Sequence, residues 1–191
     1  MISSGFSDHL PFFFGSLRAA PAALSTRAVG WLGALAAART RAWDCGTGNG
    51  QAAIGPAEFF DVVATTDASA SQIESALAHA RARCRVAAAE NPELEHRSVD
   101  LISVTRAPHW FDLPRFYSQT SYALIGGGVR TAWCWGRCRI GARIDAVIAT
   151  LSRDILGPYW PAQRNHIDDA CSSNDFPYDC ISVPRFEIRA R

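Results

Sequence analysis

The sequence predicts an α/β fold built on a doubly wound, mostly parallel β-sheet. Apolar, partly β-branched runs alternate along the chain with segments of helical periodicity, and this alternation favours right-handed crossovers between parallel strands. The run at 99–105 is almost continuously apolar, as expected for a strand with both faces covered. Three glycines at alternate positions follow the first predicted strand. In such a sheet a ligand lies at the carboxyl ends of the strands, where this loop falls.

The first elements lead into the glycine loop. Residues 21–38 are rich in alanine and leucine, and we predict a helix there with Pro21 near its start. A short strand at 41–45 follows. The next predicted helix, at 49–60, contains Gly55 and Pro56, which would break or kink it.

The second step of the pattern repeats the first. Residues 61–66 are rich in β-branched side chains and predict a strand. Ser71 and Glu74 have the spacing of a capping box, which predicts the start of a helix. The apolar face of that helix would carry Ile73, Leu77 and Ala80. A third strand is predicted at 84–88.

The second half of the chain completes five strands. The predicted elements are, in order, a strand at 99–105, a helix at 114–124, a strand at 129–135, an amphipathic helix at 141–156, an irregular stretch from 157 to about 175 that could cover a site, and a strand at 181–188.

The glycine loop narrows the choice of ligand. Gly46, Gly48 and Gly50 lack the spacing of a dinucleotide fingerprint, since Gln51 occupies its sixth position. All nineteen basic residues are arginine, so a phosphate-binding P-loop and a Schiff-base lysine are both excluded. Asp67 ends the next apolar run, where an acid can take ribose hydroxyls. A nucleoside with a cationic amino-acid end, S-adenosyl-L-methionine, suits this pattern best.

Five stretches, in order, resemble the motifs of class I S-adenosylmethionine-dependent methyltransferases. They are Asp44–Ala53, Val62–Ser69, Arg85–Glu90, Val99–Val104 followed by Pro108–Asp112, and Gly126–Val129. The chain is most similar to the type 11 and trans-aconitate methyltransferase-like branch, from about residue 25 to residue 190. The resemblance implies a Rossmann-like methyltransferase fold and a small-molecule methyl acceptor such as a carboxylic acid.

The resemblance also implies residue roles. The residues that would hold the cofactor are Asp44, Gly46, Thr47 and Gly48 near its methionine part, Asp67 and Ala68 at the ribose, and Ala89 and Glu90 beside the adenine. On the acceptor side, His109 would be a general base or an orienting residue, Trp110 a pocket wall, and Arg106 a partner for an acidic substrate or a solvated surface charge. No metal is implied.

The chain departs from this branch in several places. Arg18 and Pro21 remain from an N-terminal segment whose tyrosine is missing, and Arg130 stands at an aliphatic position of the fifth strand. The last strands of the branch are also not matched. We therefore expect a single domain, 1–191, with an N-terminal helical cover at 1–38, a cofactor-binding core at 39–140 and a substrate-side segment at 141–191. An uncovered fifth strand would let a homodimer form through an open sheet edge.

Composition and charge narrow the class of protein. The chain is 48% hydrophobic and 19% charged, with a formal net charge of +1, which is typical of a globular domain and gives no electrostatic footprint for nucleic acid or membrane. The six cysteines lack a paired zinc-binding spacing, and we expect buried free thiols in the cytoplasm. The alternative to an active enzyme is a degenerate, non-catalytic domain that binds S-adenosylmethionine. A nucleotide-linked oxidoreductase is a distant third interpretation.

Overall fold

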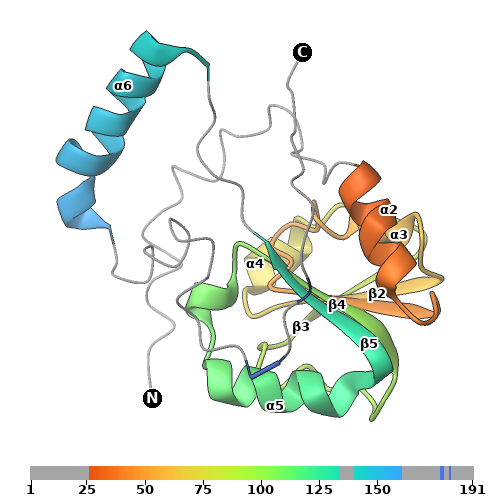
Figure 1. Ribbon diagram of the computed structural model, residues 1–191. Coiled ribbons are helices and arrows are strands. Elements are labelled where there is room, and N and C mark those ends of the chain that lie inside the picture. Colours follow the sequence, from red (N-terminus) through yellow and green to blue (C-terminus); the bar gives the residue numbers. More distant parts are fainter. Residues whose placement is uncertain (1–25, 134–139, 161–176, 179–180, 182–191) are drawn as a thin grey trace.

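The computed structural model describes residues 26–133, 140–160, 177–178 and 181. Its centre is a five-stranded sheet with strand order β3-β2-β1-β4-β5, in which every neighbouring pair is parallel (Figure 1). The strands are β1 (Arg41–Cys45), β2 (Val62–Asp67), β3 (Ala82–Val86), β4 (Val99–Thr105) and β5 (Leu124–Trp133). The prediction of a mostly parallel sheet is confirmed, and β1 lies at its centre.

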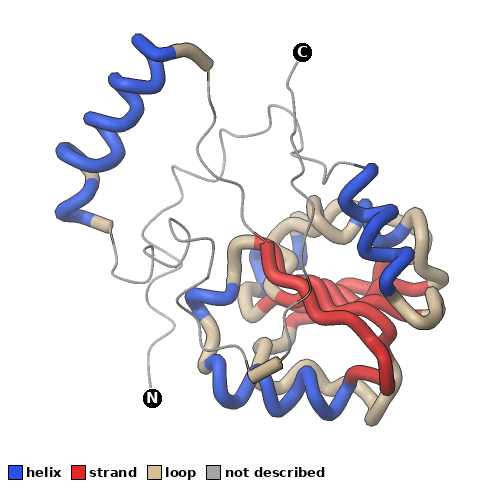
Figure 2. The backbone as a smooth tube through the Cα atoms, in the orientation of Figure 1, coloured by secondary structure: helices blue, strands red, loops and turns tan. Residues whose placement is uncertain are grey.

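Helices cover both faces of this sheet. The helices are α2 (Thr26–Leu35), α3 (Ile54–Ala57), α4 (Ala70–Glu74), α5 (Leu113–Ala123) and α6 (Ala142–Thr150), with short turns η1 (Pro108–Trp110), η2 (Leu151–Ile155) and η3 (Gly157–Tyr159). α2 and α3 lie on one side of the sheet and α5 lies on the other (Figure 2). None of the described helices is long and apolar enough to cross a membrane.

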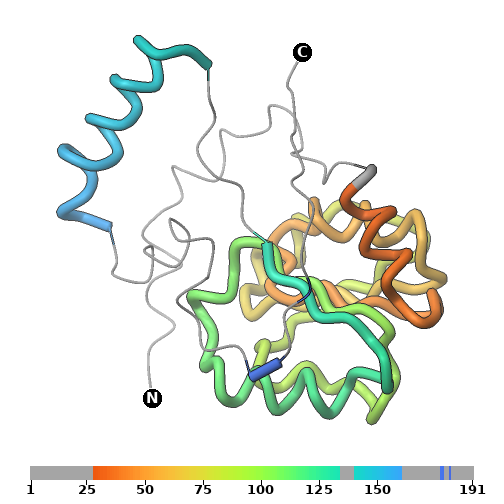
Figure 3. The backbone as a smooth tube through the Cα atoms, viewed as in Figure 1, coloured from red at the N-terminus to blue at the C-terminus, as the bar shows by residue number. Residues whose placement is uncertain are grey.

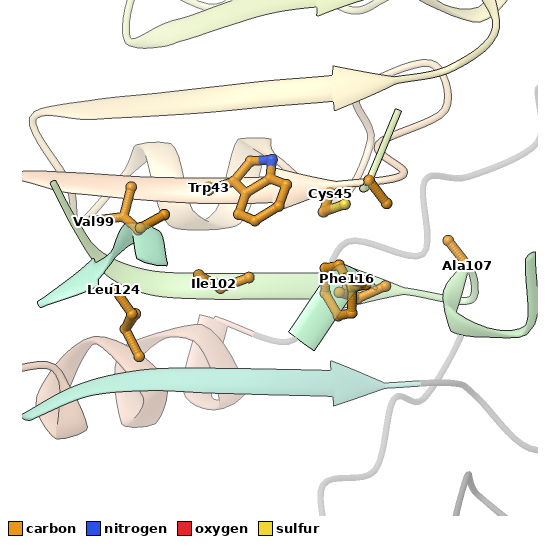
Figure 4. Close-up of a cluster of buried hydrophobic side chains, with 10 residues drawn as sticks. Trp43, Cys45, Val99, Ile102, Ala107, Phe116 and Leu124 are labelled. Atoms are coloured by element: carbon orange, nitrogen blue, oxygen red, sulfur yellow. The ribbon is translucent and has the colours of Figure 1, made fainter. Parts of the chain in front are cut away.

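The alternation of side chains along β1 supplies both halves of the core. Trp43 and Cys45 face α5 and pack in a cluster with Ile102 and Phe116 (Figure 4). Ala42 faces the opposite way, into a cluster with side chains of α3. The Trp43 ring is fully buried, and its Nε1 donates a hydrogen bond to Thr66 Oγ1 at 2.9 Å. The large ring is therefore buried without leaving its polar atom unpaired.

The helix predicted after the glycine loop is much shorter than expected. It covers four residues as α3, and residues 51–53 form turns instead. Pro56 lacks an N–H and cannot continue the hydrogen-bond ladder from the residues before it. Gly55 packs so closely against α2 that a Cβ there would lie 2.7 Å from Val29 Cγ2.

The predicted capping box at Ser71 is wrong. Ser69 is the N-cap of α4 and makes no side-chain capping bond, so Ser71 lies inside the helix. The helix ends at Glu74 because the chain turns back toward the glycine loop, where Leu77 N donates to Asn49 O at 2.9 Å. Leu77 is consequently exposed instead of contributing to an apolar face. β3 begins two residues earlier than predicted.

The three glycines at 126–128 lie inside β5, although the sequence predicts a strand only from residue 129. The register between β4 and β5 shifts between Val99 and Leu101, and this irregularity accommodates the extra residues. Gly127 has a φ of 77°, which favours glycine. A Cβ on Gly128 would lie 2.7 Å from Leu124 Cγ. β5 therefore begins five residues before the predicted strand.

Arg130 lies on β5, at the edge of the described sheet. Its guanidinium carbon lies 3.8 Å from the centroid of the Tyr178 ring, and its Nη2 donates to Ser121 Oγ at 3.2 Å. Tyr178 also donates to the carbonyl oxygen of Tyr117 on α5. A cation on this strand is thus accommodated by an aromatic face at the rim of the sheet.

The C-terminal predictions are only partly covered. The helix predicted at 141–156 is divided into α6 and the π-helical turn η2, and it stands apart from the sheet (Figure 3). Ile181 is not in a strand, and the rest of the predicted strand at 181–188 lies outside the described residues, as do Pro21 and most of the irregular stretch. Cys45 is buried and free as expected, whereas Cys84 is exposed on β3 and corrects that expectation; the other four cysteines lie outside the described residues.

Candidate functional site

The predicted site residues all lie at the carboxyl edge of the sheet. Because the five strands are parallel, the loop after β1, the end of β2, the turn after β3 and the segment after β4 meet at this edge. These positions hold, respectively, the glycine loop, Asp67, Ala89 with Glu90, and the residues 106–112, which we call the acceptor segment.

The glycine loop needs glycine for two different reasons. Gly46, Gly48 and Gly50 all have positive φ values, of 66°, 57° and 80°, where other residues are strained. At Gly46 the protein itself also excludes a side chain, since a Cβ would lie 2.5 Å from Ala107 Cβ. At Gly48 the nearest atom, Oε1 of Gln72, is 3.7 Å away. The second glycine therefore leaves its backbone open for a ligand to approach.

Asp67 connects the end of β2 to the glycine loop. Its Oδ2 accepts a hydrogen bond from Gly48 N at 2.8 Å, and its Oδ1 accepts one from Ser69 N at 2.9 Å. A carboxylate has about four lone-pair positions, so both oxygens of this half-buried side chain keep capacity for further donors. Ala68 is exposed beside it.

Asp44, on β1, holds the glycine loop through hydrogen bonds of its buried side chain. Its side chain is 1% exposed, its Oδ2 accepts from Thr47 Oγ1 and its Oδ1 accepts from Ser103 Oγ, both at 2.7 Å. Burial raises the pKa of Asp44 to about 6, although the two hydroxyl donors oppose this shift. With almost no exposed surface of its own, Asp44 fixes the position of Thr47 in the glycine loop.

Sequence reasoning did not identify Ser103. It lies on β4 directly opposite Asp44 in the parallel register. The available signal was a single serine within the apolar run at 99–105, which was predicted to be a buried strand. Because a buried hydroxyl in such a run needs a partner, this serine could have been matched with the acid at the end of β1.

Negative charge gathers at this edge. Burial is the largest cause that raises the pKa of the Cys45 thiol, and the charges of Asp44, Glu90 and Asp67 raise it further. Three carboxylates near one loop favour a ligand that carries a positive charge. Among the described residues, no three side chains are placed to hold a metal ion.

The acceptor segment lies next to the glycine loop. Ala107 packs against Gly46, and Arg106, at a φ of 56°, donates its backbone N–H to Trp133 O at 2.9 Å. The rings of His109 and Trp110 have centroids 4.7 Å apart, and Trp110 is 62% exposed. Both side chains lie on η1 at the carboxyl end of β4, as predicted.

Glu90 makes a contact that the sequence did not predict. Its Oε1 accepts a hydrogen bond from Asp112 N at 2.7 Å. Ala89, beside it, is buried in the same core cluster as Ala107, and Phe111 packs against that cluster. The turn after β3 is therefore joined directly to the far end of the acceptor segment.

Comparisons with known proteins agree with this arrangement. A family model described as a methyltransferase domain matches residues 43–130. A Dictyostelium discoideum protein assigned as a methyltransferase is 37% identical over 134 residues, which are 69% of this chain and 51% of that protein. The chain thus spans about half the length of this curated relative.

Solved structures are similar as well. A structure from Anaeromyxobacter dehalogenans, assigned as a type II methyltransferase, superposes with a TM-score of 0.78 at 38% identity and covers 83% of this chain and 68% of that one. A geranyl diphosphate methyltransferase in complex with S-adenosylmethionine has a TM-score of 0.51 at 18% identity, covering 68% of this chain and 64% of its own. The second similarity shows the fold alone.

The two reasons for glycine in the loop can be separated by mutation. Gly46→Ala should lower the free energy of unfolding by about 2–4 kcal/mol, because strain at positive φ adds to overpacking against Ala107. Gly48→Ala is the matched control, with a similar φ and open space, and should cost only about 1–2 kcal/mol. Denaturant unfolding measures both. Adding Ala107→Gly should recover the overpacking part in the Gly46→Ala background only; equal losses in the two single variants would contradict this account.

Asp44 should make stability depend on pH. Its pKa is raised from 3.8 to about 6 in the folded protein, so the folded state holds this proton more tightly than the unfolded state. The resulting stabilisation is fully present below pH 3.8 and is lost as the pH rises through about 6. Relative to Asp44→Asn, which stays neutral, the wild-type protein should lose about 2–3 kcal/mol over this range. Parallel pH dependences of the two proteins in urea unfolding would show that Asp44 does not titrate in this way.

Proposed function

We propose that this chain, which belongs to the class I S-adenosylmethionine-dependent methyltransferase family, methylates a small organic molecule. The proposed methyl acceptor is a carboxylic acid. When bound, S-adenosylmethionine supplies a methyl group activated by its sulfonium. The observation that carries the proposal is the bond from Gly48 N to Asp67, because it joins a glycine loop open to a ligand with a carboxylate at the end of the next strand.

The cofactor would lie across the ends of β1, β2 and β3. The backbone of Gly46, Thr47 and Gly48 would face its methionine part, and Asp44 would hold Thr47 in place. Asp67, which has unused lone pairs, would accept from the ribose hydroxyls, with Ala68 beside it. The surrounding carboxylates favour the cationic cofactor over a neutral nucleoside.

Ala89 and Glu90 would lie beside the adenine. Ala89 is buried and Glu90 is half-buried at the turn after β3, next to the position proposed for the ribose. A flat purine can contact such a turn through its face and edge, with the backbone supplying hydrogen bonds.

The acceptor would approach over the acceptor segment. Arg106 would attract a carboxylate, and the exposed Trp110 would form a wall of its site. A carboxylic acid is already ionised at neutral pH, so methyl transfer to its oxygen needs no general base. His109 would then orient the acceptor and would not take a proton from it. These features favour a member of the trans-aconitate methyltransferase-like branch.

The remaining proposals concern organisation. The described core at 39–133 would bind the cofactor, and the chain from 141 onward would belong to the acceptor side. β5, at the sheet edge, would be the contact of a homodimer. Light scattering combined with size-exclusion chromatography measures the mass of the protein in solution and so distinguishes a dimer from a monomer.

Asp67 should govern ribose binding. Asp67→Ala should weaken S-adenosylhomocysteine binding, measured by calorimetry, by about 1–3 kcal/mol, the effect of losing hydrogen bonds to a charged group. Asp67 also holds Gly48 and Ser69, so a 2′-deoxy analogue of the ligand is needed to isolate the ribose contact. The wild-type protein should bind that analogue more weakly, whereas the variant should barely distinguish the two ligands. Asp61→Ala, an exposed acid just before β2, is the control; equal discrimination by the variant and the wild type would exclude Asp67 from this role.

Turnover should show a carboxylate acceptor. Incubation with S-adenosylmethionine and a panel of mono-, di- and tricarboxylic acids, with their amides as neutral counterparts, should give methyl esters of the acids only. His109→Gln should keep activity within about 10-fold, since loss of a general base would cost about 10²–10⁴-fold. Arg106→Gln should raise KM for the acids. Cofactor binding without product from any acid would indicate a different acceptor class or a non-catalytic domain.

A further inference from the structure

The acceptor segment is fixed at both ends by residues outside it. At its start, Arg106 N bonds to Trp133 O of β5 and Ala107 packs against Gly46 of the loop. At its end, Asp112 N donates to Glu90 Oε1 at 2.7 Å. The bonds from Trp110 N to Ala107 O and from Phe111 N to Pro108 O are internal to the segment. Glu90 therefore attaches the far end of the segment through its side chain.

This hydrogen bond has favourable electrostatics. Asp112 is the N-cap of α5, an eleven-residue helix, and its own side chain accepts from Arg115 N. The amino end of a helix carries a partial positive charge. The carboxylate oxygen of Glu90 thus accepts a short hydrogen bond at the amino end of the helix, where an acidic side chain is favoured. The contact holds the end of the acceptor segment and the beginning of α5 together.

The same turn belongs to the cofactor side of the edge. Ala89, the residue before Glu90, is buried in the core cluster that contains Ala107, and Phe111 packs against that cluster. A change in the position of residues 89–90 would therefore reach the acceptor segment by two paths, through the hydrogen bond to Asp112 and through packing on Ala107 and Phe111.

We propose that Glu90 is a positioning residue that couples occupancy of the adenine site to the order of the acceptor segment. This inference rests on the function proposed above. Cofactor binding fixes the turn at Ala89 and Glu90, the carboxylate holds Asp112, and His109 and Trp110 take a defined place beside the methyl group. Glu90 thereby acts on the acceptor through the backbone of the segment and without touching it.

Hydrogen exchange of the backbone amides in 106–112 tests the coupling and requires no known acceptor. In the wild-type protein, saturating S-adenosylhomocysteine should slow exchange across the segment. In Glu90→Ala, exchange at Asp112 should become about 10-fold faster or more without ligand, as expected when a hydrogen bond to a charged group is lost, and the ligand should no longer slow it.

Two further variants separate the effect of the length of the Glu90 side chain from the effect of its charge. Glu90→Gln keeps an acceptor oxygen at the same distance and should restore most of the protection and its response to ligand. Glu90→Asp keeps the charge but is one methylene shorter, so it should behave like Glu90→Ala, and it serves if the alanine variant does not fold. Glu95→Ala is the control, since it removes an exposed acid from the same loop, one that pairs with Arg41 at 3.9 Å, and it should exchange like the wild type.

The outcomes distinguish this inference from the proposed function. If calorimetry shows that S-adenosylhomocysteine binds but Asp112 exchanges identically in the wild type, Glu90→Ala and Glu90→Asp, the coupling is overturned and the cofactor site stands. If Glu90→Ala only lowers the thermal midpoint and the segment still responds to ligand, Glu90 merely stabilises α5 and the coupling is again wrong. If the wild-type protein does not bind S-adenosylhomocysteine, the proposed function and the coupling fail together.

Discussion

The buried carboxylate of Asp44 is the interaction on which the geometry of this site depends. A charge at 1% exposure is expensive unless its oxygens find donors, and here the donors come from two different elements, Thr47 of the glycine loop and Ser103 of β4. The carboxylate thus joins β1, its neighbouring strand and the loop above them. Because an unpaired arrangement would be costly, this bonding pattern selects one conformation of a loop whose glycines would otherwise allow many.

The parallel sheet turns this local order into a site. Every strand presents its carboxyl end at one edge, and the order β3-β2-β1-β4-β5 puts the glycine loop between the acid of β2 and the segment after β4. Side chains then join these neighbours in pairs, Asp67 with Gly48 and Glu90 with Asp112. The proposed cofactor and acceptor sites therefore share walls, and a change in one of them is transmitted to the other over one or two residues.

The sequence predicted the sheet well because buried strands have a strong local signal. β1 and β4 have the predicted bounds, and β2 differs by one residue at each end, since apolar and β-branched runs determine them. The helices were less predictable. α3 is short because Pro56 interrupts its hydrogen-bond ladder, as its place in the sequence predicted. α4 is short because the chain turns back at Leu77 to reach Asn49. The second cause is a tertiary contact, and a capping-box spacing cannot report it.

The site was predictable to a similar extent. The glycine loop, Asp67 and the segment at His109 were found from motifs, and the structure places all of them at one edge. What the sequence could not show is which backbone atoms their side chains hold. Glu90 and Asp112 are twenty-two positions apart, and only the folded chain reveals that Gly46 is required by a neighbouring alanine as well as by its own φ.

The brevity of α4 has a consequence for how a ligand enters. Its five residues include no buried side chain, and the chain after it is held at the glycine loop by the bond from Leu77 N to Asn49 O. A segment with so little buried surface opens locally at a free-energy cost far below that of unfolding the domain. The segment of α4 beside the glycine loop can consequently unfold and refold locally while the sheet stays intact. Cofactor binding would then order this segment, so the heat-capacity change on binding should be more negative than a rigid site would give.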